Sequence, residues 1–178
     1  GGNVSSVASP YCWLMMIAFL LPMTAQASDV PDWLPQYQLD LKLDVNQRRL
    51  WGVEKVTFYN RHDRPASELV FNAYSRYKIP EEESVKLAKT LELLRSNPSD
   101  GIDWVGERLN VQSVSTVDSR GVLRPIPFVW RKDLHTAFEV ALATPLKKGE
   151  SITVEIHFTL DFPEKEGRWG HRDGITFL

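Results

Sequence analysis

The sequence of 178 residues divides into an uncharged beginning and a charged remainder, because its first charged side chain is Asp29. The remaining stretch of roughly 150 residues suffices for one domain that buries about two thirds of its unfolded surface, and is too short for a large multidomain enzyme. A net charge of −2 and a pI near 6.1 argue against a nucleic-acid-binding protein, which would carry a clustered positive face. The composition, 43% hydrophobic and 25% charged, excludes wholesale disorder. The only cysteine, Cys12, lies in the uncharged beginning, so we expect neither an internal disulfide nor a thiolate metal site in the body.

The uncharged beginning is typical of a secretory signal peptide. Residues 13–21 read WLMMIAFLL, and residues 25–27 read AQA, a small-residue cleavage pattern. The apolar stretch holds nine residues, whereas a helix needs about 20 to cross a bilayer, so an uncleaved anchor or an internal apolar helix is the weaker interpretation. We expect residues 1–27 to be a signal peptide cleaved near Ala27, and residues 28–178 to be exported to a periplasm or the cell exterior without a stable membrane span. No basic residue precedes the apolar stretch and the chain opens with Gly1, so we expect the natural N-terminus to lie upstream.

The first part of the body has the alternation of a β-sheet. Residues 36–45 alternate strictly and predict a half-buried strand, and a polar turn at residues 46–49 leads to a second strand over residues 50–59. Gly52 in that second strand indicates a bulge or a close backbone approach. Residues 68–75 predict a third strand from their β-branched and aromatic content. The side chains expected on the buried face of the first strand are Tyr37, Leu39, Leu41, Leu43 and Val45.

One helix interrupts the strands. It begins at Pro80, carries acidic side chains in its first turn, has an apolar stripe of Val85, Ala88, Leu91 and Leu94, and ends at residues 96–101. Strands follow over residues 109–117, 122–130, 137–143 and 151–160, the second with two prolines that favour an edge position, and residues 164–173 read as a loop. Six or seven strands with one inserted α-helix predict a mainly β domain, an antiparallel sandwich or saddle, over residues 28–178.

The sequence contains no recognisable active-site motif. A zinc site on a helix needs the H-E-x-x-H spacing, and no two of the histidines His62, His135, His157 and His171 stand four residues apart. A nucleophile elbow, a phosphate-binding glycine loop and a calcium loop are absent as well. We therefore assign no catalytic residue, no metal ligand and no cofactor to this chain, and its substrate-binding residues remain unknown.

Three groups of ionisable residues could carry chemistry, and each has a plainer interpretation. Glu155 and His157 share one face of a strand about 7 Å apart and could form half of a metal site or an acid–base pair, but alternation alone predicts polar residues on a solvated sheet face. Asp40 and Asp44 are separated by about 13 Å along a strand, which favours solvation. The run of glutamates at residues 81–83 could attract cations, although the helix dipole already explains it.

The tryptophans suggest a different class of function. A sugar-stacking platform could use them, whereas core packing or contacts between domains are the commoner role of such large side chains. Trp169, which lies between glycines in RWGHRD, is predicted to contact another domain. The tryptophans concerned are Trp33, Trp51, Trp104, Trp130 and Trp169.

Residues 36–178 resemble the N-terminal β domain of the aminopeptidase N and leukotriene A4 hydrolase family of zinc metallopeptidases, especially its exported bacterial members. The segments that carry the resemblance are residues 50–60, like the family's strand pair with a glycine and a terminal asparagine, ELVF at residues 68–71, and the closing strand at residues 145–158. The family's zinc helix, further glutamate ligand and G-x-M-E-N loop belong to a following domain, so none of its catalytic residues maps onto a position of this chain.

The resemblance implies an exported zinc aminopeptidase in which this domain walls one side of the catalytic cleft. Whether the chain is itself an enzyme stays open. It is either a truncated copy of a longer enzyme, which its two abrupt ends favour, or a free-standing relative without catalysis. The implied partners are the catalytic domain of the same polypeptide and peptide substrates, and zinc is implied only for that absent domain. The alternative from another class is an exported β-sandwich module that binds glycans or surface partners, which the surplus of tryptophans motivates.

Overall fold

The computed structural model describes residue 31, residues 33–166 and residues 169–177. The predicted signal peptide and its cleavage site lie outside these ranges. Within them the chain is built mainly from antiparallel strands, which confirms the mainly β class predicted from the sequence. No helix in the described ranges is long and apolar enough to cross a membrane.

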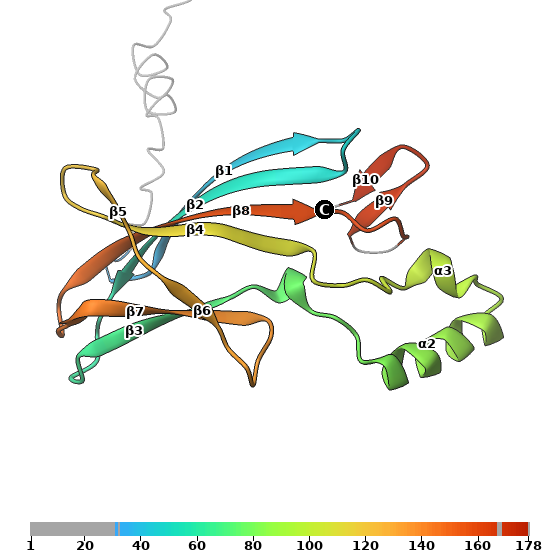
Figure 1. Ribbon diagram of the computed structural model, residues 1–178, viewed down its shortest axis with the longest axis horizontal. Coiled ribbons are helices and arrows are strands. Elements are labelled where there is room, and N and C mark those ends of the chain that lie inside the picture. Colours follow the sequence, from blue (N-terminus) through green and yellow to red (C-terminus); the bar gives the residue numbers. More distant parts are fainter. Residues whose placement is uncertain (1–30, 32, 167–168, 178) are drawn as a thin grey trace, which may run out of the picture. The chain divides into compact units, whose positions relative to one another are not determined.

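The larger sheet has five strands in the order β1-β2-β8-β4-β5, all paired antiparallel (Figure 1). β8 is its central strand, with β2 on one side and β4 on the other. The register pairs even-numbered residues of β2 with even-numbered residues of β8, so the apolar side chains of both strands share one face. The strands are β1 (Gln36–Asp44), β2 (Arg49–Tyr59), β8 (Ser151–Asp161), β4 (Leu109–Val117) and β5 (Leu123–Pro125).

The smaller sheet has three strands in the order β3-β7-β6 and lies across the apolar face of the larger one (Figure 1). Its strands are β3 (Ala66–Asn72), β7 (Ala137–Leu146) and β6 (Phe128–Trp130). The strand predicted over residues 122–130 is in fact two short strands, because the chain leaves the larger sheet after β5 and joins the smaller one at β6. Pro125 and Pro127 flank this crossing, where each lacks a backbone donor for a continuous ladder.

The core lies between the two sheets. Val154 and Ile156 of β8 and Phe138 and Val140 of β7 are each at most 3% exposed. The inward alternation predicted for the last two long strands is therefore confirmed. Phe138 is at the centre of an aromatic group, since its ring centroid lies 5.3 Å from that of Trp130 and 5.4 Å from that of Phe128.

β1 forms as predicted, but its apolar face is not buried. The side chains expected to face the core are 40–61% exposed: Tyr37, Leu39, Leu41, Leu43 and Val45. The three strands of the smaller sheet do not extend far enough to cover the edge of a five-stranded sheet, and no buried residue of the core cluster comes from β1. The expectation of a half-buried first strand is wrong for this reason.

Gly52 of β2 leaves room for an aromatic ring of the neighbouring strand to lie close to its backbone. Its cross-strand partner is Phe158, and a Cβ at residue 52 would overlap the Phe158 ring. The close-approach interpretation of this glycine is confirmed, and the register between β2 and β8 continues through it without a bulge.

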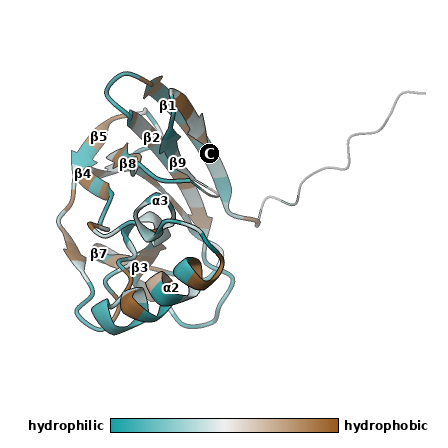
Figure 2. Cartoon of the chain, turned by 90° about the vertical axis from the view of Figure 1, so that its right-hand side faces the viewer, coloured by the Kyte–Doolittle hydropathy of each residue, from teal (hydrophilic) through white to brown (hydrophobic). Residues whose placement is uncertain are grey.

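A helical segment connects the smaller sheet to β4. The third strand ends earlier than predicted, at Asn72, and a 3-10 turn, η2 (Tyr74–Arg76), follows. The predicted helix is α2 (Glu81–Leu93), and residues 98–101, predicted only to end it, form a helical turn of their own, α3 (Pro98–Gly101). α2 presents both hydrophilic and hydrophobic residues to solvent (Figure 2). Within the predicted stripe, Ala88 and Leu91 are half-buried while Val85 and Leu94 are exposed, because α2 packs on little besides α3.

The C-terminal residues predicted as a loop contain a small hairpin. β9 (Gly170–Arg172) and β10 (Ile175–Phe177) pair antiparallel around a two-residue turn. Asp173 and Gly174 form that turn with φ of 50° and 78°, the left-handed conformation that such a tight hairpin requires.

Candidate functional site

The most distinctive concave surface is an aromatic cavity of about 350 Å³ beside the helical segment. We call it the aromatic pocket. η2 and the residues after it contribute Tyr74, Ser75, Tyr77 and Ile79, while α3 and the segment before β9 contribute Gly101, Asp103, Lys165 and Trp169. It thus joins three segments that are far apart in the sequence.

Two exposed tyrosines dominate one wall of the aromatic pocket. The rings of Tyr74 and Tyr77 are parallel within 3°, with centroids 5.9 Å apart, and their side chains are 72% and 44% exposed. A 3-10 turn places residues three apart on the same side, which is why these rings stack. Trp169, which also lines the pocket, meets Phe162 edge to face and is half-buried.

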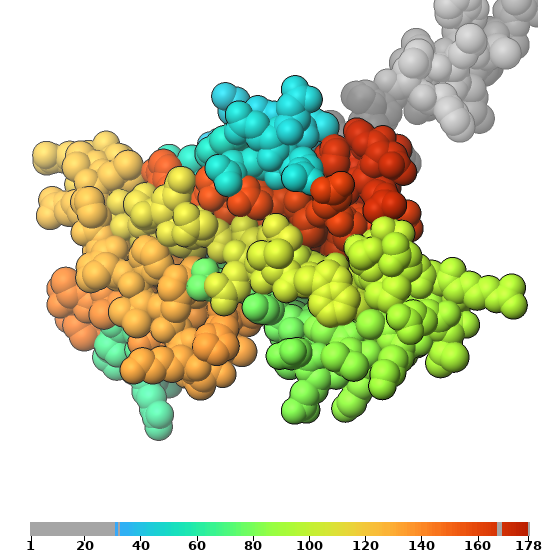
Figure 3. Space-filling model, turned by 45° about the vertical axis from the view of Figure 1, so that its right-hand side comes forward, coloured from blue at the N-terminus to red at the C-terminus, as the bar shows by residue number. Residues whose placement is uncertain are grey.

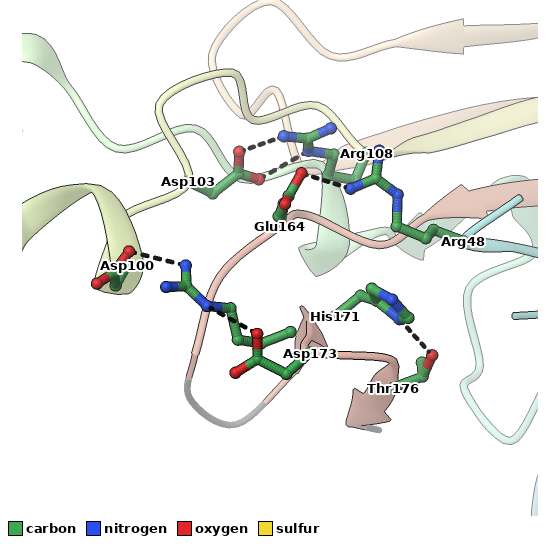
Figure 4. Close-up of polar contacts among 9 residues, drawn as sticks. Arg48, Asp100, Asp103, Arg108, Glu164, His171, Asp173 and Thr176 are labelled. Atoms are coloured by element: carbon green, nitrogen blue, oxygen red, sulfur yellow. Dashed lines mark hydrogen bonds and ion pairs between the residues drawn. The ribbon is translucent and has the colours of Figure 1, made fainter. Parts of the chain in front are cut away.

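An ion pair between Asp103, which lines the pocket, and Arg108 holds this part of the pocket in place. Arg108 donates from Nε to Asp103 Oδ2 at 2.9 Å and from Nη2 to Oδ1 at 2.6 Å (Figure 4). The backbone N–H groups of Val105 and Gly106 also donate to the Asp103 carboxylate. Burial acts to raise the pKa of Asp103, but the Arg108 hydrogen bonds and these backbone donors outweigh it and lower the pKa. Asp103 is therefore an ionised, fully engaged carboxylate that supports the loop and is not poised for proton transfer.

Further ion pairs hold the C-terminal hairpin next to the pocket. Arg172 donates to Asp100 of α3 at 2.8 Å, and Arg48 donates to Glu164 at 2.7 Å (Figure 4). His171 of β9 contacts Thr176 of β10 through Nδ1 at 2.9 Å. These contacts position the segment that carries Trp169 without relying on a large apolar interface.

Glu155 and His157 meet directly, which the strand geometry alone did not predict. His157 Nε2 lies 2.6 Å from Glu155 Oε1, and Lys55 Nζ lies 3.2 Å from Glu155 Oε2. Glu155 is only 5% exposed, so the expectation that it faces solvent is wrong. β8 is the central strand, and Lys55 and Ser115 stand opposite Glu155 on the two adjacent strands, which shield its carboxylate.

Its hydrogen bond with His157 and its ion pair with Lys55 keep this buried carboxylate ionised. The hydrogen bond with His157 is the largest influence and lowers the pKa of Glu155, desolvation opposes it, and Lys55 lowers it further. Both carboxylate oxygens are already engaged, so the group stabilises the sheet and does not form half of a metal site.

The other ionisable candidates behave as their plainer interpretations predicted. Asp40 and Asp44 are surface residues of β1, and Asp44 accepts a hydrogen bond from the Gln47 backbone within the turn. The glutamates at residues 81–83 are exposed in the first turn of α2, where the helix dipole favours them.

The tryptophans do not form a shared platform. Trp33 stacks under Arg61, and Trp130 packs against the core with Arg76 above it, the guanidinium carbons lying 3.8 and 4.2 Å from the ring centroids. Trp104 is 49% exposed, and Trp51 is half-buried on β2. All five of these side chains remain at least partly exposed. Of the two roles expected for most of them, core packing is seen for Trp130, and contacts with another domain stay a prediction.

Glu54 is an ionisable residue that the sequence did not single out. It lies on the core side of β2 and lines a cavity of about 330 Å³ between the sheets, together with Phe71 and Phe158. Burial raises the pKa of its carboxyl group. An acidic residue among the apolar alternate positions of that strand was the available signal.

Among the described residues, no group of three or more histidine, cysteine, aspartate or glutamate side chains could hold a metal ion. His62 and His135 line separate surface cavities, while His157 and His171 make the contacts described above. What the aromatic pocket offers is a surface for flat or apolar groups, with its tyrosine hydroxyls as polar contacts.

No model of a known protein family matches the chain, and no curated protein matches it. Solved structures do match it. The M1 zinc metallopeptidase from Deinococcus radiodurans aligns at 15% identity with a TM-score of 0.46, over 79% of this chain and 24% of that chain. A mutant of that enzyme bound to a Tyr-Ser-Ala substrate, and a mutant two-domain M1 zinc metallopeptidase bound to L-arginine, give the same values. This chain spans about a quarter of the length of these structures.

Proposed function

We propose that this chain is the non-catalytic N-terminal β domain of an exported, zinc-dependent, aminopeptidase-like metallopeptidase. In this proposal the domain walls one side of the cleft in which a separate catalytic domain of the same polypeptide hydrolyses peptides. The observation that carries the proposal is the aromatic pocket, which presents Tyr74 and Tyr77 to solvent next to a half-buried Trp169. Exposed apolar patches of this kind mark interaction sites.

The pocket suits a domain interface better than a catalytic role. Among the described residues that line it, the carboxylate of Asp103 is held by Arg108, and the ammonium group of Lys165 lies 5.9 Å from the Trp169 ring centroid. These groups hold the walls in place, and the tyrosines remain available to receive side chains of a neighbouring domain. A zinc ion in such an enzyme activates a water molecule and polarises the scissile carbonyl, and that chemistry would belong to the catalytic domain.

The test compares the isolated chain with the native polypeptide that contains it. Tyr74→Ser with Tyr77→Ser should change the stability of the isolated chain by no more than about 0.5 kcal/mol, because both side chains are solvent-exposed. In the native polypeptide the same pair should lower the thermal midpoint and expose the domain junction to proteolysis. Val129→Ser, which alters a 61% exposed side chain of β6, is the matched control. Equal effects of the tyrosine pair in both proteins would remove the docking role.

A glycan-binding module is the second candidate, because parallel exposed aromatic rings such as Tyr74 and Tyr77 also suit the faces of sugar rings. Retardation of the chain on immobilised polysaccharides, lost in the tyrosine double variant and kept in Val129→Ser, would favour this candidate. The absence of retardation across a panel of glycans would leave the docking role.

A further inference from the structure

β1 is an edge strand of the larger sheet. Among the described residues it pairs only with β2, and its outer side presents the backbone groups of a nine-residue strand. Natural sheets shield such edges with prolines, bulges, short strands or charged side chains. β1 contains no proline, its register with β2 is unbroken, and its central charges, Asp40 and Lys42, are of opposite sign, so they can pair with a second such strand. The first eight of its residues are exposed, and the blue-to-cyan residues, which include β1, lie along part of the upper edge of the view in Figure 3. A strand of this length and exposure is built to accept another strand.

We propose that β1 pairs antiparallel with β1 of a second copy of this chain, across a twofold axis at Leu41. The pairing joins the two larger sheets into one continuous sheet and satisfies the free backbone groups of both edges. It is isologous, because each copy uses the same strand, and it therefore closes at a dimer. This inference does not depend on the proposed function.

Charge selects this register. With Leu41 opposite its own copy, Asp40 stands opposite Lys42 of the partner subunit, and Lys42 opposite the partner's Asp40, so two opposite-charge pairs form. Shifting the centre to Asp40 places two aspartates opposite each other. Shifting it to Lys42 places two lysines opposite each other and pairs Asp40 with Asp44. Shifts by a single residue put polar side chains opposite leucines.

The same register matches the apolar face. Leu39 comes to lie opposite the partner's Leu43 and Leu43 opposite the partner's Leu39, on the side of the sheet where both leucines are 40–51% exposed in a single copy. Directly opposed side chains of an antiparallel pair have Cβ atoms about 5 Å apart, which is contact distance for leucines. The pairing thus covers part of the surface that the smaller sheet leaves open.

Sedimentation velocity on the full chain tests the pairing. The unaltered chain should form a concentration-dependent dimer. Asp40→Lys places two lysine pairs across the axis and Lys42→Asp places two aspartate pairs, so each substitution alone should raise the dimer dissociation constant by about tenfold or more. Lys89→Asp, which makes the same charge change on an exposed residue of α2, is the control and should leave the dimer unchanged.

Mixing the two single variants gives the sharpest result. A copy carrying Asp40→Lys has two lysines on this face, and a copy carrying Lys42→Asp has two aspartates, so the register predicts a heterodimer from two weakened homodimers. The double exchange Asp40→Lys with Lys42→Asp should restore a homodimer. A chain that stays monomeric into the range of 10⁻⁴ M, roughly where weak specific contacts are populated, overturns the proposal. A dimer unaffected by either single exchange overturns it as well, and points to another surface.

Discussion

Replacing the buried carboxylate on the outer face of the larger sheet gives the most direct energetic test of the structure. Glu155→Gln keeps the size of the side chain but removes its charge, and with it the ion pair with Lys55 at 3.2 Å and the hydrogen bond between the carboxylate and His157 at 2.6 Å. Hydrogen bonds to charged groups contribute about 1.5–3 kcal/mol each. Lys55 and His157 are both 41% exposed and regain water when the Glu155 charge is lost, so the two contacts together should count for less than their sum, about 1–3 kcal/mol.

The stability difference between the unaltered chain and Glu155→Gln should depend on pH in a defined direction. The pKa of Glu155 is lowered in the folded protein, so its contribution is present above the unfolded value of about 4.3 and is lost as the pH falls through the folded pKa. The stability gap between the unaltered chain and Glu155→Gln should therefore be full at pH 7 and shrink below about pH 4. Urea unfolding followed by circular dichroism at both pH values measures it. In a body of this size, a loss of 2 kcal/mol lowers the thermal midpoint by roughly 4–8 °C.

The control for this experiment is Glu92→Gln, which neutralises an exposed carboxylate on α2. It should change the free energy of unfolding by less than about 0.5 kcal/mol at either pH. A Glu155→Gln variant as stable as this control at pH 7, or a gap that widens in acid, would show that the carboxylate is not held in the ionic cluster described here.

Two further substitutions test the packing between and within the sheets. Gly52→Ala should destabilise the chain by about 1–3 kcal/mol in urea unfolding because its Cβ displaces the Phe158 ring, and the cost should fall when Phe158→Leu is added. An additive double variant would contradict this contact. Phe138→Ala should cost about 3–5 kcal/mol, since this 3% exposed ring joins the core to Phe128 and Trp130, whereas Phe177→Ala on the exposed end of β10 should cost far less.

Alternation along the sequence predicted where the strands lie more reliably than whether their apolar faces are buried. It placed β7 and β8 and their inward faces correctly, because both strands are covered by the opposite sheet. The same pattern in β1 led to a wrong expectation of burial. Periodicity shows that a face is apolar, but what covers that face depends on how many strands the opposite sheet has, and this is a property of the tertiary structure.

Local turn chemistry explains two other differences. The Asp173–Gly174 dipeptide between short β segments is a strong hairpin signal, and the prediction of a loop over residues 164–173 overlooked it. Pro125 and Pro127 alone could not predict that residues 122–130 divide between two sheets. Those prolines predicted an edge position correctly, but not that the chain would pass from one sheet to the other.

The candidate site was the least predictable part. Strand spacing placed Glu155 and His157 on one face, but Lys55 completes their cluster from a strand about a hundred residues away in the sequence, and only the register brings it there. The aromatic pocket likewise combines η2, α3 and the segment before β9. Of the residues that line this pocket, only Trp169 was identified from the sequence, by its position between glycines.

The central claim, that this chain serves as the β domain of a longer zinc peptidase, is tested most directly on the native protein. An antibody raised against residues 33–166 captures that protein from its source, and its intact mass and zinc content are then measured. The account predicts a polypeptide several times heavier than 20.4 kDa, with one zinc ion per chain and release of amino acids from aminoacyl anilides, while the isolated chain binds no zinc and releases none. A native product of about 20 kDa or less, without zinc, would contradict it.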